Sequence, residues 1–317
     1  MLTMTTLRRL WTTDLPLTAT GLLMLAGLVA ALAGLWLDPR LITGAPAWLK
    51  PAKFAISTAI YTLTLAWIFT YLRDWPRTRR IVGWTTAVIL VVEVGLIYVQ
   101  AWRGTSSHFN VGTPFDAMVF GVMGIGIVVQ TLASVAAAVA LWRQRFEDVA
   151  LGWAMRLGLT ISIVGASTGG LMTVPTDAQI ANARATHQMP LSGAHTVGGA
   201  DGGPGIAGTG WSREHGDIRV PHFLGLHALQ GLAIIALLLP RRSPDTRRVR
   251  LTLVAAGSYV ALFVLLLIQA LRGEPLMTPS AAILVSLTVW ALVSALAAWL
   301  VTAPRAAAAR GSAIVLG

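Results

Sequence analysis

The stretch LPLTATGLLMLAGLVAALAGLWL, residues 15–37, carries no charged side chain along its whole length. As a helix that rises about 1.5 Å per residue, it is long enough to cross the roughly 30 Å hydrocarbon core of a bilayer. Asp14 and Pro16 provide a capping side chain and a first-turn proline at its start. The stretch therefore predicts a membrane-spanning helix.

Seven further apolar runs of similar length follow, and the composition agrees with them. Hydrophobic residues make up 55% of the chain, charged residues only 12%, and mean hydropathy is +0.69, whereas a soluble domain usually carries about 25% charge. We predict an all-α polytopic membrane helix bundle with about eight transmembrane helices. The further runs are roughly 48–72, 81–102, 115–142, 149–174, 220–240, 249–271 and 279–302.

The basic residues lie mainly between these runs. With the N-terminus inside, the inner segments hold 15 arginines and the outer segments hold 8 basic residues. Short cytoplasmic loops are enriched in Lys and Arg, so both termini are predicted to be cytoplasmic, in a bacterial inner membrane. We therefore interpret the net charge of +11 as a consequence of how the chain is oriented in the membrane. No RNP, zinc-finger or helix-turn-helix pattern supports nucleic-acid binding.

The first run also has a competing interpretation as a cleaved signal peptide. Arg8 and Arg9 precede the run from Leu17, and Ala31-Leu32-Ala33 could form a cleavage site. The apolar run continues through Leu37, which is longer than a normal signal core. This length favours an uncleaved first helix.

A short sequence echo indicates an internal repeat. Residues 100–104, QAWRG, end the third run, and residues 269–273, QALRG, end the seventh; a Thr-Pro pair opens the next run in both cases, at 113–114 and 278–279. We predict a parallel 4+4 duplication, with one half at 1–145 and the other at 146–317. The outer loop 175–219 has no counterpart of similar length in the first half, so it is a candidate for function.

The chain has no cysteine, which excludes disulfides and thiolate chemistry. All six histidines lie on the predicted outer side or at the outer end of a run. Neutral imidazole and carboxylate suit a Cu, Fe or Zn ion, and axial histidine suits haem. His187 and His215 are interpreted as solvated loop residues. The candidate ligands of a metal ion or haem are His108, His195, His222, His227 and Asp201.

The stretch DIRVPHFLGLHALQ, residues 217–230, carries two of these histidines. On a regular helix, side chains five residues apart differ by about 140° and about 7.5 Å, so His222 and His227 cannot bind one ion side by side. Each is predicted to take a partner from another segment. In the alternative interpretation, both are helix-interface residues that bond to backbone and water.

The glycine-rich stretch HTVGGADGGPGIAGTGW, residues 195–211, has two interpretations. Its glycines would let the backbone approach a ligand closely. A flexible linker is the alternative. No Gly-Lys-Ser/Thr ending follows, so it is not a phosphate-binding P-loop.

Glu93 is the only acid near the centre of an apolar run. An unpaired carboxylate there is costly, so Glu93 is protonated, paired with Arg156 or part of a polar path. Gln100 lies on the same helical face. Lys50 and Lys53 are the only lysines. In one interpretation their side chains extend to the membrane interface; in the other they supply an ammonium group that can release a proton. The candidate catalytic residues are Glu93, Lys53 and Gln100.

Four strings in this sequence resemble those of a family of uncharacterised bacterial polytopic integral membrane proteins. They are WLKPAKF (48–54), RGTSSHFN (103–110), HTVGGADGGPG (195–205) and DIRVPHFLGLHALQ (217–230). The resemblance extends along most of the chain and implies a membrane location but no activity. Heme A synthase also has two four-helix halves, but here the second, fourth and eighth runs have no internal histidine.

Three functional hypotheses follow from these residues. The first is a membrane oxidoreductase with an outward-facing metal or haem site, acting on a small or lipid-soluble substrate such as a quinone. The second is a proton-coupled transporter without a metal, because a mid-membrane acid within a repeated fold is typical of such carriers. The third is a non-catalytic assembly subunit that docks a membrane-protein partner through the 175–219 loop.

Overall fold

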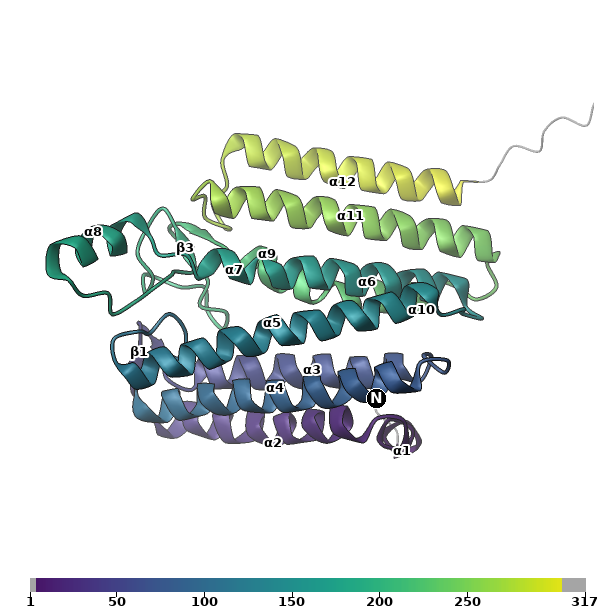
Figure 1. The fold of residues 1–317 in the computed structure, drawn as a ribbon. Helices are drawn as coiled ribbons and strands as arrows, with labels where there is room; N and C mark the ends of the chain where they lie inside the picture. Colours follow the sequence, from purple (N-terminus) through teal and green to yellow (C-terminus); the bar gives the residue numbers. More distant parts are fainter. Residues whose placement is uncertain (1–3, 304–317) are drawn as a thin grey trace, which may run out of the picture.

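The computed structural model describes residues 4–303, which form a bundle of long, roughly parallel and antiparallel helices (Figure 1). Two short antiparallel sheets, β1–β2 and β3–β4, lie in the connections; Leu41 pairs with Pro46, and Thr196 pairs with Asp217. The strands are β1 Leu41–Ile42, β2 Ala45–Pro46, β3 Thr196–Val197 and β4 Gly216–Asp217. The helices are α1 Met4–Thr13, α2 Leu15–Leu37, α3 Leu49–Phe69, α4 Pro76–Arg103, α5 Pro114–Arg143, α6 Val149–Ser167, α7 Gly169–Met172, α8 Asp177–Thr186, α9 Arg219–Leu226, α10 Ala228–Leu238, α11 Asp245–Leu271 and α12 Ala281–Thr302.

The helix lengths and hydropathies confirm a polytopic membrane bundle. Within residues 4–303, seven helices are long and apolar enough to cross a bilayer, and the bent pair α9–α10 makes an eighth if it is counted as one span. Large apolar side chains cover the outer faces of α2, α5 and α12, where lipid would contact them. The 4+4 repeat and the division into halves at residue 145 stay predictions.

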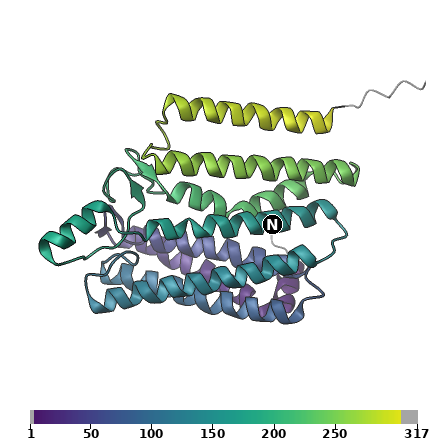
Figure 2. The same cartoon turned by 45° about the horizontal axis from the view of Figure 1, so that its top comes forward.

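The main apolar core joins helices from both ends of the sequence. Buried side chains from α3, α5, α6 and α10 meet in one cluster, which includes Phe69, Leu141, Met155 and Leu232. Helices α2, α3 and α4 lie together on one side of α5 and α6, and α11 and α12 lie on the other (Figures 1 and 2). Helix α12 packs against α11 at the edge of the bundle and buries little beyond Ile283.

The helix starts predicted at Asp14 and at Thr113-Pro114 are confirmed. The start predicted at Thr278-Pro279 is two residues too early. Asp14 Oδ1 accepts a hydrogen bond from Leu17 N at 3.0 Å, and Thr113 caps α5 in the same way. Helix α12 is capped by Ser280, not by Thr278. The reason is that Ser280 N donates to Glu274 Oε2 at 3.0 Å, which fixes Ser280 as the last residue before the helix.

The two QAxRG segments form the same kind of helix end. Gly104 and Gly273 adopt φ of 74° and 75°, the left-handed region that favours glycine at a helix C-terminus. In each, the glutamine side chain donates to the carbonyl six residues ahead, at 3.5 Å for Gln100 and 2.7 Å for Gln269. The echo therefore records a shared local structure at these two positions.

The predicted sixth span is broken at His227, where α9 and α10 meet at 46°. The assumption of one regular helix through residues 220–240 is therefore wrong, and the 140° relation between His222 and His227 does not apply. The close approach of α6 forces the bend, because Gly165 and Gly225 pack backbone against backbone. A Cβ atom on either glycine would overlap the Cα atom of the other.

Side chains from neighbouring helices satisfy the backbone groups that the bend sets free. Ser162 Oγ donates to Leu226 O at 3.1 Å and accepts from Leu229 N at 3.2 Å. Tyr259 OH donates to Leu224 O at 2.6 Å. A side chain inserted into the helical ladder is a recognised cause of a kink, and in a bilayer these groups have no water to bond instead.

We expect Gly165→Ala to destabilise the protein. The added methyl group would push α9 away from α6, and overpacking of this kind costs about 1–3 kcal/mol. The matched control is Gly257→Ala in α11, where a Cβ atom meets no neighbour within 4 Å; it should be neutral or stabilising by about 0.5–1 kcal/mol. Thermal unfolding of the detergent-purified variants measures both effects, and equal midpoints would contradict the packing argument.

Candidate functional site

One end of the bundle carries the connections 38–48, 104–113, 173–218 and 273–280, and we call this end the loop face (Figure 1). It is the side predicted from the basic residues to be outside, and that orientation stays a prediction. Two of the arginines counted for the inner side, Arg305 and Arg310, lie outside the described residues. All the candidate ligands predicted from the sequence lie at or near the loop face.

The centre of the loop face is an imidazole between an ammonium group and a carboxylate. His108 Nδ1 lies 3.0 Å from Lys50 Nζ in the first turn of α3, and 3.1 Å from Ser107 Oγ. Its other nitrogen, Nε2, lies 3.7 Å from Oε1 of Glu93 on α4. Glu93 is only 4% exposed and lies ten residues before the end of α4. The 104–113 loop therefore folds back into the bundle and brings these three groups together.

Aromatic rings hold His108 in this position. Phe54, Phe109 and Phe120 lie with their ring centroids 5.7, 6.2 and 6.5 Å from its own. Burial, followed by the positive charge of Lys50, holds the pKa of His108 well below its usual range. The imidazole is therefore neutral at pH 7. A protonated Lys50 donates to Nδ1, so the single ring proton belongs on Nε2, which faces Glu93.

Glu93 does not pair with Arg156, so that structural alternative is wrong. Arg156 donates from Nε to Leu141 O at 3.0 Å and from Nη2 to Gln144 O at 2.7 Å, at the other end of the bundle. These carbonyls satisfy its guanidinium group. The titratable neighbours of Glu93 are instead His108 and Lys50.

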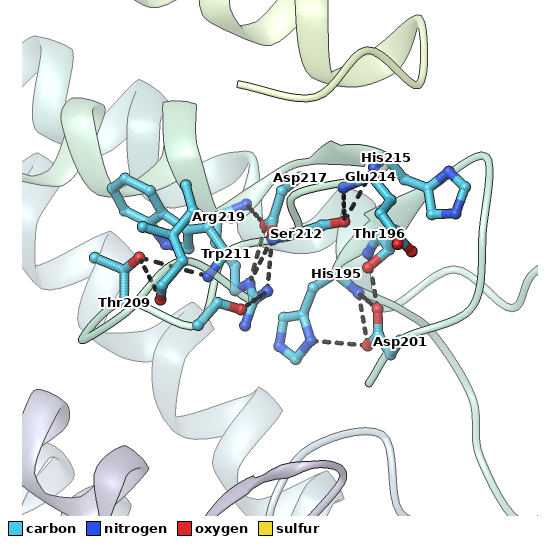
Figure 3. Close-up of polar contacts among 12 residues, drawn as sticks. His195, Thr196, Asp201, Thr209, Trp211, Ser212, Glu214, His215, Asp217 and Arg219 are labelled. Atoms are coloured by element: carbon cyan, nitrogen blue, oxygen red, sulfur yellow. Dashed lines mark hydrogen bonds and ion pairs between the residues drawn. The ribbon is translucent and has the colours of Figure 1, made fainter. Parts of the chain in front are cut away.

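A second histidine–carboxylate pair orders the glycine-rich loop (Figure 3). His195 Nδ1 lies 2.8 Å from Asp201 Oδ2, and the amides of His195 and Thr196 donate to the same carboxylate. Burial alone would raise the pKa of Asp201, but the hydrogen bonds and charge of His195 outweigh it and hold the pKa below its usual range. Burial also lowers the pKa of His195. The segment is thus a folded loop, and the flexible-linker alternative is wrong.

Further polar contacts attach this loop to the helices. Asp217 accepts from Arg219 Nη2 at 2.6 Å and from Ser212 N at 2.7 Å (Figure 3). Lys53 Nζ donates to Thr209 O at 2.7 Å. Lys53, predicted to be catalytic, therefore anchors the loop, while Lys50 reaches the buried histidine. The two lysines lie one helical turn apart, so their spacing cannot tell which one points inward.

Gln100 lies in a buried network at the start of α5. Its Nε2 donates to Asp116 Oδ1 at 2.8 Å, and its Oε1 accepts from Arg103. Arg103 and Thr113 donate to the same Asp116 carboxylate, at 2.6 and 2.7 Å. Both ends of the Gln100 amide are occupied, and its catalytic role stays a prediction.

His222 and His227 have separate surroundings. His222 Nδ1 lies 2.9 Å from Gly165 O, so it bonds to α6. His227 lies at the bend between α9 and α10, with its ring centroid 4.4 Å from that of Phe223. Within residues 4–303, no three His, Asp or Glu side chains lie close enough to hold one metal ion. The predicted ligands share one end of the bundle, but as they lie they do not form a group of three around one metal ion.

The fold and this cluster define a class: a multi-pass membrane protein with buried titratable side chains at one end of its bundle. Comparison of the chain with protein families, with curated proteins and with solved structures finds no match in any of the three. The function must therefore be argued from the site itself.

We expect Asp201→Asn to loosen the glycine-rich loop. Asparagine keeps one acceptor oxygen but loses the charge and the second acceptor, at a cost of about 1–3 kcal/mol. Amide hydrogen exchange in 195–217 at pH 7 should become roughly tenfold faster or more. Asp177→Asn, an exposed acid in the same connection, is the control and should change nothing there.

The pH dependence of the same variant tests whether the negative charge of Asp201 causes the stabilisation. The pKa of Asp201 is lowered by folding, so its stabilisation is complete above about pH 4 and is lost as the pH falls below that value. The difference between the wild-type protein and Asp201→Asn should therefore shrink progressively as the pH falls below about 4 towards the lower pKa of the folded state. A difference that stays constant from pH 7 down to about pH 2 would show that the charge is not the cause.

Proposed function

We propose that this protein is a proton-coupled carrier for a small solute, and that Lys50, His108 and Glu93 are its proton-transfer site. The observation that carries the proposal is the placement of one imidazole between an ammonium group at 3.0 Å and a carboxylate at 3.7 Å. Ionisable side chains inside a membrane bundle are costly and mark proton relays and ion pathways. A neutral imidazole that bonds to a donor through one nitrogen and faces an acceptor with the other can pass a proton without changing its own charge.

The relay can be written with its atoms in balance. A proton leaves Lys50 Nζ for His108 Nδ1 while the proton on Nε2 passes to Glu93. Lysine becomes neutral, glutamate becomes protonated, and the imidazole changes tautomer. The Nε2–Oε1 separation of 3.7 Å is beyond a direct hydrogen bond, so this step requires the two groups to approach by a few tenths of an ångström or to share a water molecule.

The broken span supports a carrier rather than a purely structural protein. Substrate and ion sites of many carriers lie at interrupted helices near the membrane midplane. Here the bend at His227 lies one turn from Gln230, whose Nε2 contacts Thr64 Oγ1 at 3.5 Å and whose Oε1 is buried without a donor among the described residues. Buried polar atoms without partners are rare in folded proteins and need a specific explanation. A polar solute between α3 and α10 would supply that donor.

The metal-dependent oxidoreductase hypothesis has less support. It needs several of the predicted ligands around one point, and the described histidines bond instead to Lys50, to Asp201 and to backbone. Absorption spectroscopy and metal analysis of the purified protein separate the two hypotheses. A stoichiometric metal or a Soret band would favour the oxidoreductase over the carrier.

The proton site is tested in vesicles loaded with the pH dye pyranine, with an inward-negative potassium–valinomycin potential. With a mixture of amino acids, sugars and organic acids outside as candidate solutes, vesicles with the wild-type protein should acidify faster than empty vesicles. Glu93→Gln and His108→Gln should lower the rate roughly 100-fold or more, because general acid–base groups contribute about 10²- to 10⁴-fold. Lys50→Arg should lower it too, because the guanidinium keeps the charge but does not release a proton.

Glu214→Gln is the matched control, because this acid is exposed on the same loop face. It should leave proton uptake unchanged. Size-exclusion profiles and helical circular dichroism confirm that each variant is folded. Folded Glu93→Gln protein with wild-type uptake would overturn the proposed site, and wild-type vesicles no faster than empty ones would overturn proton transport.

A further inference from the structure

A cavity of about 210 Å³ lies at the end of the bundle opposite the loop face. It is formed where α1 ends and where α2 and α4 begin. This end has no part in the proton-transfer site, and it combines both signs of charge in a small space. Its lining residues are Thr13, Asp14, Leu15, Pro16, Pro76, Arg79, Arg80 and Trp84.

The acidic wall of the cavity is Asp14, which is only 6% exposed. Its Oδ1 accepts from Leu17 N and caps α2. Its Oδ2 accepts no hydrogen bond from any side chain or amide of residues 4–303, and it rests against Gly83 of α4, where a Cβ atom would overlap it. One carboxylate oxygen is thus held at the cavity by packing and is open to an outside donor.

The basic wall consists of Arg79 and Arg80 in the first turns of α4. Arg79 Nη1 donates to Phe69 O at 3.1 Å, which fixes the guanidinium, while its buried Nε has no acceptor among the described residues. Neither arginine forms an ion pair with Asp14. The partial positive charge at the starts of α2 and α4 adds to the same wall. The opposite charges are therefore held apart, with space between them.

We propose that this cavity binds a phosphoethanolamine group, with its phosphate against Arg79 and Arg80 and its primary ammonium against Asp14. The group carries an anion and an N–H donor at a fixed short separation, which matches the two walls. A bare phosphate would place an anion beside the Asp14 carboxylate with no cation between them. A choline group has no N–H to donate.

The size and depth of the cavity favour a lipid headgroup. Sites that enclose a whole small molecule usually measure about 300–1,000 Å³, so this one suits a headgroup whose chains remain outside. Helix α1 lies across the end of the bundle (Figure 1), with Leu10 buried and Arg8, Arg9 and Trp11 exposed. Amphipathic helices of this kind lie at the membrane interface, at the depth of the headgroups.

The ionisation of Asp14 agrees with a cationic partner. Burial raises its pKa to about 6, against the lowering effects of the Leu17 amide and of Arg79. An ammonium group at Oδ2 would favour the charged form that burial penalises.

The proposal is tested by native mass spectrometry of the full chain in detergent micelles with added lipid. Phosphatidylethanolamine should bind at least tenfold more tightly than phosphatidylcholine, which lacks N–H, or phosphatidylglycerol, which lacks the ammonium. Arg79→Gln with Arg80→Gln should remove binding of all three. Asp14→Asn keeps a good helix cap but should reduce phosphatidylethanolamine to the level of phosphatidylglycerol.

Arg77→Gln is the matched control, because Arg77 is exposed on the same turn of α4 but does not line the cavity. Soluble phosphoethanolamine at millimolar concentration is added as a competitor: displacement of the lipid shows that a free group can also fill the site, and no displacement assigns it to membrane lipid. Equal binding of the three lipids, or wild-type binding in the double arginine variant or in Asp14→Asn, would overturn the proposal.

Discussion

The bend between α9 and α10 depends on contacts with the neighbouring helix α6. A bilayer offers no water to unpaired backbone groups, so a helix can be interrupted there only where side chains replace the lost bonds. Ser162 does this by donating to Leu226 O and accepting from Leu229 N. The bend sets the direction of α9, at whose start the ordered loop that contains His195 ends. The geometry of the loop face thus depends on a contact made by α6 inside the bundle.

Polar side chains in this protein differ in whether the bundle provides hydrogen-bond or ion-pair partners for them. Several arginines bond to carbonyls or carboxylates at the two ends, as Arg156 does with Leu141 O and Gln144 O. Glu93 differs from these arginines, because it lies within a span and its titratable neighbours are His108, at 3.7 Å, and Lys50. Glu93 is therefore a candidate for proton transfer, whereas the contacts of arginines such as Arg156 are structural.

Several candidate residues have surroundings that the sequence pattern did not show, and each case has a physical cause. Gln100 and Glu93 share a helical face, but Gln100 is bonded to Asp116 and Arg103, which come from beyond the helix end. Lys50 and Lys53 differ by one helical turn, and only the folded loops show that Lys50 reaches the histidine. His222 and His227 were compared on a straight helix, and the Gly165–Gly225 contact bends that helix. In all three cases the deciding partner is distant in sequence.

The sequence by itself determined the membrane class, the helical spans, the caps at Asp14 and Thr113 and the gathering of histidines towards one end. These properties depend on composition and on neighbours within a few residues, which a linear pattern records directly. Only the tertiary structure decided that His108 lies between Lys50 and Glu93, that Asp201 holds His195, and that Asp14 faces two arginines across a cavity. Such contacts depend on how far each loop folds back and on how closely two helices approach, and both follow from packing between segments remote in sequence.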